Sequence, residues 1–127
     1  MKKMILILSI PFCLLYSCST SNHFNRYNNS NKKSGKWIET VSLPDTVNFI
    51  YSKYKNGIKK GKTQIQYSNG KMSKGCYVND KKQGCWIYYD EKNNIFKKEY
   101  YTEGYLSRIE FFENGKIVKS AISDPAF

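Results

Sequence analysis

From residue 35 onward, apolar and polar side chains alternate along the chain with a period of two. This period is typical of β-strands with one covered face, because successive side chains of a strand point to opposite sides. The side chains expected to share a face include Val47 with Phe49 and Tyr51, Thr63 with Ile65 and Tyr67, and Trp86 with Tyr88. We therefore predict an all-β chain, with strands at about residues 36–43, 47–54, 61–67, 71–78, 84–89, 95–101, 105–112 and 116–122.

Three motifs recur about every 23 residues between these strands. One is Tyr-Lys-Asn-Gly at 54–57, Tyr-Val-Asn-Asp at 77–80 and Tyr-Thr-Glu-Gly at 101–104. Another is Gly-Lys-Trp at 35–37, Gly-Lys-Thr at 61–63 and Gly-Cys-Trp at 84–86. The third is an aromatic residue, a turn and an apolar residue, at 67–72, 89–95 and 112–117. Asn-Gly between alternating apolar residues favours a tight hairpin turn, so each repeat is predicted to be a hairpin.

The succession Tyr-x-Asn-Gly, Gly-x-Trp and Tyr-x-Asn-Gly-Lys resembles the MORN repeat in its shorter bacterial variant, which also builds the YwqK-type antitoxin family. The resemblance covers about residues 35–118, and Thr63 and Asp80 depart from it by replacing a Trp and a Gly. It implies an elongated, twisted antiparallel sheet of successive hairpins, in which aromatic side chains stack along one face and each repeat contacts only its neighbours. We expect this domain to span residues 35–122, with a C-terminal tail at 123–127.

The first eighteen residues have the layout of an export signal. Lys2 and Lys3 precede an apolar run from residue 4 to 15, which is shorter than the roughly 20 residues of a transmembrane anchor. Leu15-Tyr16-Ser17-Cys18 resembles a bacterial lipobox, although Tyr16 departs from its usual small or aliphatic residue. The resemblance implies that residues 1–17 are a signal peptide and that Cys18 carries the lipid. We expect a lipoprotein of the bacterial cell envelope, held on the outer membrane or the cell membrane.

Residues 18–34 are predicted to be the lipidated cysteine and a disordered tether, because they contain many Asn and Ser and almost no aliphatic side chains. The chain without residues 1–17 keeps 19 Lys and Arg against 10 Asp and Glu. Such a charge favours anionic partners, namely lipid head groups, cell-wall polymers or an acidic protein. Export argues against nucleic acid.

The densest basic run and the aromatic stripe supply the candidate binding residues. They are Lys55, Lys59, Lys60, Lys62, Trp86 and Tyr88. The alternative for the lysines is a solvated edge that prevents aggregation between sheets. The alternative for the aromatic side chains is a structural role, since they supply large apolar faces to a sheet too thin for an enclosed core.

Cys76 and Cys85 lie at equal distances from the centre of a hairpin whose loop we place at Asp80 and Lys81. This register would set the two cysteines opposite each other, where a disulfide is possible. Two free thiols and half of a metal site are the alternatives. Two cysteines without a nearby histidine do not complete a tetrahedral zinc site, so we expect neither a metal nor another cofactor.

We find no catalytic constellation in the sequence. His23 is the only histidine and falls in the predicted tether, which removes nucleophile and histidine pairs. Residues 57–63 approach a phosphate-binding loop, but the spacing of their glycines is wrong. The sequence therefore favours a non-catalytic binding or scaffold module for a protein or envelope component. An immunity or antitoxin-type protein, an enzyme acting on cell-wall polymer and a purely structural lipoprotein are the alternatives.

Overall fold

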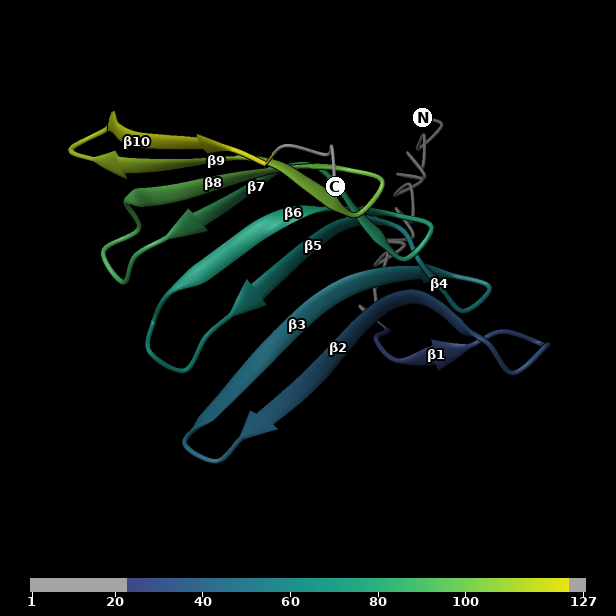
Figure 1. The fold of residues 1–127 in the computed structure, drawn as a ribbon. Helices are drawn as coiled ribbons and strands as arrows, with labels where there is room; N and C mark the ends of the chain where they lie inside the picture. Colours follow the sequence, from purple (N-terminus) through teal and green to yellow (C-terminus); the bar gives the residue numbers. More distant parts are fainter. Residues whose placement is uncertain (1–22, 124–127) are drawn as a thin grey trace, which may run out of the picture.

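The computed structural model describes residues 23–123, which form one antiparallel sheet without helices (Figure 1). None of these residues belongs to a helix with the length and apolarity needed to cross a membrane. The strands are β1 (Arg26–Tyr27), β2 (Lys33–Leu43), β3 (Thr46–Lys55), β4 (Ile58–Lys59), β5 (Gly61–Gln66), β6 (Met72–Val78), β7 (Lys81–Tyr89), β8 (Ile95–Thr102), β9 (Tyr105–Glu113) and β10 (Lys116–Ile122). The predicted all-β fold of successive hairpins is confirmed.

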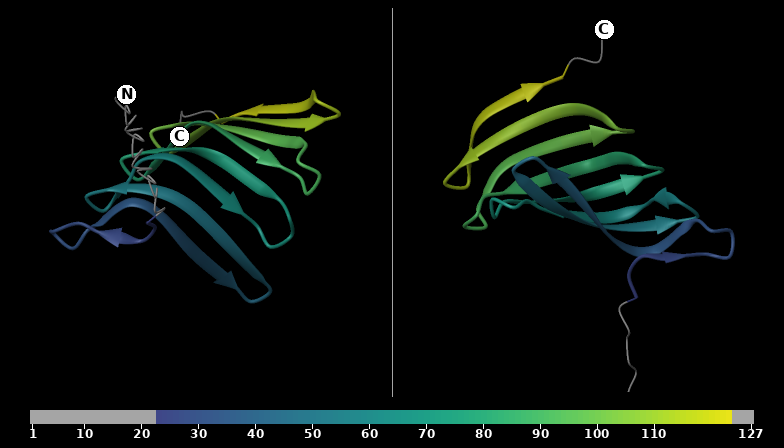
Figure 2. Two further views of the ribbon diagram at one scale, coloured as in Figure 1. Left: turned by 180° about the vertical axis from the view of Figure 1, so that it is seen from behind. Right: turned by 90° about the horizontal axis from the view of Figure 1, so that it is seen from below.

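The order of strands in the sheet follows their order in the chain, except that the short β4 pairs only with β3. Figure 2 shows the consequence: the sheet is twisted and arched, and it runs from β1 at one end to β10 at the other. Each strand between β1 and β10 in this order contacts the strands directly before and after it, and the two end strands each contact one neighbour. Stability therefore comes from contacts between neighbouring hairpins.

Tight turns with positive φ explain why the chain reverses where it does. Asn56-Gly57, Asn79-Asp80, Glu103-Gly104 and Asn114-Gly115 each form a two-residue connection in which both residues have positive φ. Two positive φ values give a turn whose twist matches that of the strands. The turn at Asn79 and Asp80 lies one residue before the predicted loop, so the register that we predicted between Cys76 and the turn is wrong.

The prediction of a disordered tether is also wrong for residues 23–34, the part of that segment that the structure describes. β1 pairs with the start of β2, and Phe24 forms a bridge with Lys36. The ring of Tyr27 meets that of Trp37 edge to face at 5.1 Å. The Asn28 side chain accepts hydrogen bonds from two following backbone N–H groups, which holds the intervening turn. Local polar contacts and two aromatic rings thus order a segment that has little aliphatic content.

Trp37 and Trp86 are the buried apolar side chains of the described region, and Trp86 is fully buried. Both lie on one face of the sheet, which we call the covered face. Small residues stand next to them: Trp37 pairs with Ser52, and Gly75 lies under Trp86. Val47 and Phe49 are exposed on the opposite, open face. The alternation therefore identified which residues share a face, but the apolar set on β3 lies on the side that stays open.

Candidate functional site

A ladder of lysines and aromatic rings occupies the covered face. Each lysine lies over rings, at 4.5 to 5.4 Å from the ring centroids. The ladder consists of Lys33 over Trp37 and Tyr54, Lys59 over Tyr54 and Tyr77, and Lys82 over Trp86 and Tyr101. A cation over the face of an aromatic ring is attracted by its quadrupole, by about 0.5–2 kcal/mol. The ladder therefore joins one repeat to the next.

The backbone of the same three lysines also contacts the hairpin turns that follow them in the chain. Their carbonyl oxygens accept hydrogen bonds from the second residue of each turn. The pairs are Gly57 to Lys33 at 2.8 Å, Asp80 to Lys59 at 3.1 Å and Gly104 to Lys82 at 2.9 Å. The recurring Tyr-x-Asn-Gly motif thus has a structural explanation. Its Tyr supplies the ring for the ladder, and its turn docks on the preceding repeat.

Two carboxylates on the covered face neutralise part of this charge. Glu39 forms ion pairs with Lys33 and Lys59 and accepts a hydrogen bond from Tyr54. Burial alone would raise the pKa of Glu39, but these partners hold it below its ordinary value. The lysines of the ladder are therefore largely committed to contacts within the sheet.

Glu99 is the second of these carboxylates. It is almost completely buried, and it accepts hydrogen bonds from Lys97, Tyr88 and Tyr101. Burial would raise the pKa of Glu99, yet its donors lower it. Burial and the bond to Glu99 raise the pKa of Tyr101 to about 12 and raise that of Tyr88 further. These phenols remain protonated donors at neutral pH.

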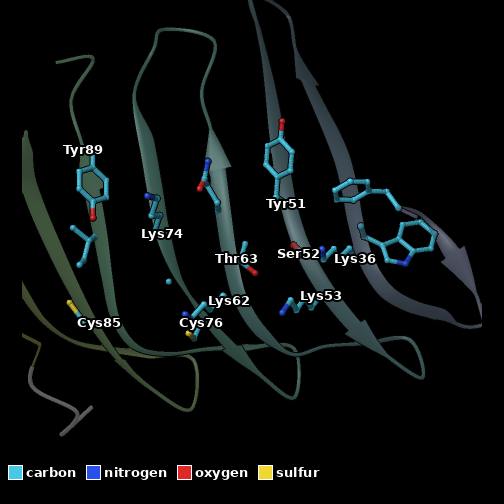
Figure 3. A pocket seen from close by; sticks show the side chains of 15 residues that line it. Lys36, Tyr51, Ser52, Lys53, Lys62, Thr63, Lys74, Cys76, Cys85 and Tyr89 are labelled. Carbon is cyan, nitrogen blue, oxygen red and sulfur yellow. The ribbon is translucent and has the colours of Figure 1, made fainter. Parts of the chain in front are cut away.

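The open face carries a groove of about 580 Å³ that crosses β2, β3, β5, β6 and β7. Four lysines line it, and no Asp or Glu does: they are Lys36, Lys53, Lys62 and Lys74. In Figure 3, Lys53, Lys62, Cys76 and Cys85 form one row across the strands, while Tyr51, Lys74 and Tyr89 form a second. The groove is therefore a basic surface with aromatic side chains beside the charges.

The register brings like charges together in this groove. Lys36 on β2 stands directly opposite Lys53 on β3. Like charges at such positions destabilise a sheet by roughly 0.2–1 kcal/mol. Neither Lys53 nor Lys62 forms an ion pair with a carboxylate of the described region. The cost of this arrangement would be offset by a bound anion.

Uncharged polar and aromatic groups form the second row of the groove. Gln64 on β5 lies between Tyr51 of β3 and Lys74 of β6, its two cross-strand partners. The Lys74 ammonium lies 5.5 Å from the ring centroid of Tyr89. Both tyrosines are half-buried, so each offers part of a ring to the groove. The row therefore combines two ring surfaces, an amide and a cation.

Cys76 and Cys85 both line the groove, and they are free thiols. Cys76 pairs with Gln83, and Cys85 pairs with Tyr100 of β8. The register of β6 against β7 shifts at Gly75, where Trp86 takes its place over the glycine. The displaced turn removes the predicted opposition of the two cysteines, because Cys76 lies between the turn and this irregularity, and the expected disulfide is not formed.

The predicted binding residues are dispersed by the fold. Lys62 lines the groove, whereas Lys59 belongs to the ladder. Lys55 and Lys60 are exposed and lie outside the groove. Trp86 is fully buried, and Tyr88 is bonded to Glu99. The groove residues missed as a group are Lys36, Tyr51, Lys53, Gln64, Lys74 and Tyr89, which only the strand register brings together.

Within residues 23–123 no group of three or more His, Cys, Asp and Glu side chains is placed to hold a metal ion. No protein-family model matches the sequence, no curated protein matches it significantly, and no solved structure does so either. The MORN resemblance therefore rests on the repeat motifs themselves. Cys18 lies outside the described residues.

Proposed function

We propose that this chain is a non-catalytic binding module whose groove binds an anionic protein or envelope component. The observation that supports the proposal most directly is the set of four lysines in the groove, without a carboxylate among the lining residues. The proposal also includes the anchor: lipid on Cys18 would hold the module at the membrane of a bacterial cell envelope. This part rests on the sequence of residues 1–18.

The two faces of the sheet support different roles for their lysines. On the covered face, Lys33 and Lys59 share the carboxylate of Glu39 and contact aromatic rings. On the open face, Lys53 and Lys62 lack such carboxylate partners within the described residues. An anion at the groove would gain the attraction of several cations and relieve their mutual repulsion. The module therefore binds through the open face.

A charge-matched pair of variants tests this role. Lys53→Gln/Lys62→Gln removes two cations from the groove, and Lys116→Gln/Lys119→Gln removes two exposed cations on β10, outside it. Both have the same net charge. Dissociation constants for polyglutamate, an oligogalacturonate and phosphatidylglycerol vesicles would be measured at physiological ionic strength. We expect the groove variant to weaken binding of at least one probe about tenfold, a loss of about 1.4 kcal/mol.

The matched variant is expected to change affinity less than threefold, since distant charges are screened over a Debye length of about 8 Å. Equal losses in the two variants would show that only net charge attracts the probes. That result would overturn the proposed groove site.

A further inference from the structure

We infer that the ligand of the groove is a linear acidic glycan, a chain of sugars that carry carboxylate or phosphate groups. The inference rests on the proposed anionic binding function and narrows it to one class of partner. It follows from the kind of groups in the groove, their order across the strands and the location of the groove on a sheet face.

The groove presents its charges and its flat surfaces in two parallel rows. Lys53 and Tyr51 are two residues apart on β3, as Lys62 and Gln64 are on β5. Residues two apart on a strand point to the same face about 7 Å from each other. A ligand lying across the strands would therefore meet cations along one side and the tyrosines, with Gln64, along the other.

This combination fits the chemistry of a charged sugar. A tyrosine ring offers an apolar face with a polar rim, on which the C–H face of a sugar ring can pack. The Gln64 amide both donates and accepts hydrogen bonds, as sugar hydroxyls do. Lysine ammonium groups attract the acidic substituents. An acidic ligand without rings would contact the lysines but would not use the accessible ring surfaces of Tyr51 and Tyr89.

The position of the groove argues against an extended acidic peptide. Peptides that bind sheets as added strands use the free N–H and C=O groups of an edge strand. The groove instead crosses the middle of the sheet, where β3, β5 and β6 pair with neighbours on both sides. Its backbone groups are thus largely engaged, and recognition depends on side chains.

The shape of the groove favours a chain over a flat surface. It crosses five strands, which corresponds to about 19 Å at the usual spacing of about 4.8 Å between strands. Figure 3 shows several of its lining side chains on neighbouring strands. A planar bilayer would contact the rim of the groove, whereas a narrow polymer would fill it. The observations therefore favour a glycan over a lipid surface.

Binding experiments with four probes test the inference. The protein as the cell makes it would be purified in detergent and titrated with an oligogalacturonate, a chain of hexose phosphates, polyglutamate of equal charge, and phosphatidylglycerol vesicles. We expect at least one glycan to bind at least tenfold more tightly than polyglutamate and vesicles. The methyl ester of the oligogalacturonate, which lacks the charges, should bind at least tenfold more weakly than the free acid if the acid is the preferred glycan.

The tyrosine row supplies the decisive variant. Tyr51→Leu is expected to weaken glycan binding about tenfold and to leave polyglutamate binding within twofold. Tyr105→Leu is the control, because Tyr105 is 78% exposed on β9 outside the groove. Tryptophan fluorescence, which reports on buried Trp86, would verify that both variants are folded.

The outcomes separate the two proposals. Tighter binding of polyglutamate or vesicles, or a Tyr51→Leu variant with unchanged glycan affinity, would overturn the glycan inference while the anionic groove stands. Failure of all four probes to show dependence on Lys53 and Lys62 would overturn both.

Discussion

The indole of Trp86 lies directly on Gly75: a Cβ atom at Gly75 would come within 2.1 Å of Trp86 Cδ2. Trp86 also donates a hydrogen bond from Nε1 to the Cys76 carbonyl oxygen at 3.2 Å. The register of β6 against β7 shifts at this point. One contact between a large and a small residue thus accompanies both the burial of the ring and the irregular pairing of the two strands.

Gly75→Ala is expected to destabilise the domain by about 1–3 kcal/mol, the usual cost of overpacking. The reason is steric, because the methyl group would need the space of the indole ring. Urea denaturation followed by circular dichroism would give the free energy of unfolding. In a Trp86→Leu background the same substitution should cost much less. An equal cost in both backgrounds would contradict the proposed contact.

Glu99 is expected to make stability depend on pH. Its folded pKa lies below the ordinary value of 4.5, so its stabilising contribution is present above that pH and is lost as pH falls through the lowered folded pKa. Glu99→Gln should lower the free energy of unfolding at pH 7 by about 1–3 kcal/mol, since its donors lose a charged acceptor. It should also flatten the fall in stability on acidification.

Glu113→Gln is the control for this experiment, because Glu113 is exposed. Thermal unfolding of the three proteins between pH 3 and pH 7, a range chosen about the ordinary pKa of glutamate, would measure the effect. A Glu99→Gln variant with the acid sensitivity of the unmodified protein would contradict the prediction.

The two cysteines of the domain are expected to react as free thiols. Cys85 is exposed and Cys76 is half-buried, so an alkylating reagent should modify Cys85 faster in the folded protein. After denaturation without a reductant, mass spectrometry should find both positions modified. A Cys76–Cys85 disulfide in protein isolated under alkylating conditions would require a different register of β6 and β7 and would contradict the structure.

Neutralising a lysine should change the stability of the domain in opposite directions on the two faces of the sheet. Lys59→Gln is expected to destabilise the domain by about 1 kcal/mol, because it removes two ring contacts and the ion pair with Glu39. Lys53→Gln should stabilise it by about 0.2–1 kcal/mol, because Lys53 stands opposite Lys36. Chemical denaturation at low and high salt would test both values. Destabilisation by Lys53→Gln would indicate that its charge contributes to folding.

The sequence predicted the hairpin order well because its signals are local. The turn motifs set where the chain reverses, and β9 and β10 lie close to the expected ranges. The covered face was harder to predict, since a period of two separates the faces but does not say which one is covered. On β3, exposed Phe49 is larger and more apolar than buried Ser52, whose cross-strand partner is Trp37.

Predicting the candidate site required the register between strands, which the sequence motifs do not give. Lys62 was identified from a run of lysines, yet the other candidates in that run lie outside the groove, and Lys59 contacts aromatic rings on the covered face. Lys36 and Lys53 are 17 positions apart in sequence and become partners only through the register of the first hairpin. The cysteines were misplaced because the turn lies one residue earlier than predicted: counting outward from Asn79 and Asp80 pairs Cys76 with Gln83.

The bonds from each turn to the lysine carbonyl of the preceding repeat mean that the protein can change in length by whole units. A duplication of one repeat would supply its own turn, ring and lysine, and the hairpins on either side would keep their contacts. The open face would then gain two strands, or about 10 Å of surface at the usual strand spacing. The number of repeats would therefore set the length of partner that the open face can contact.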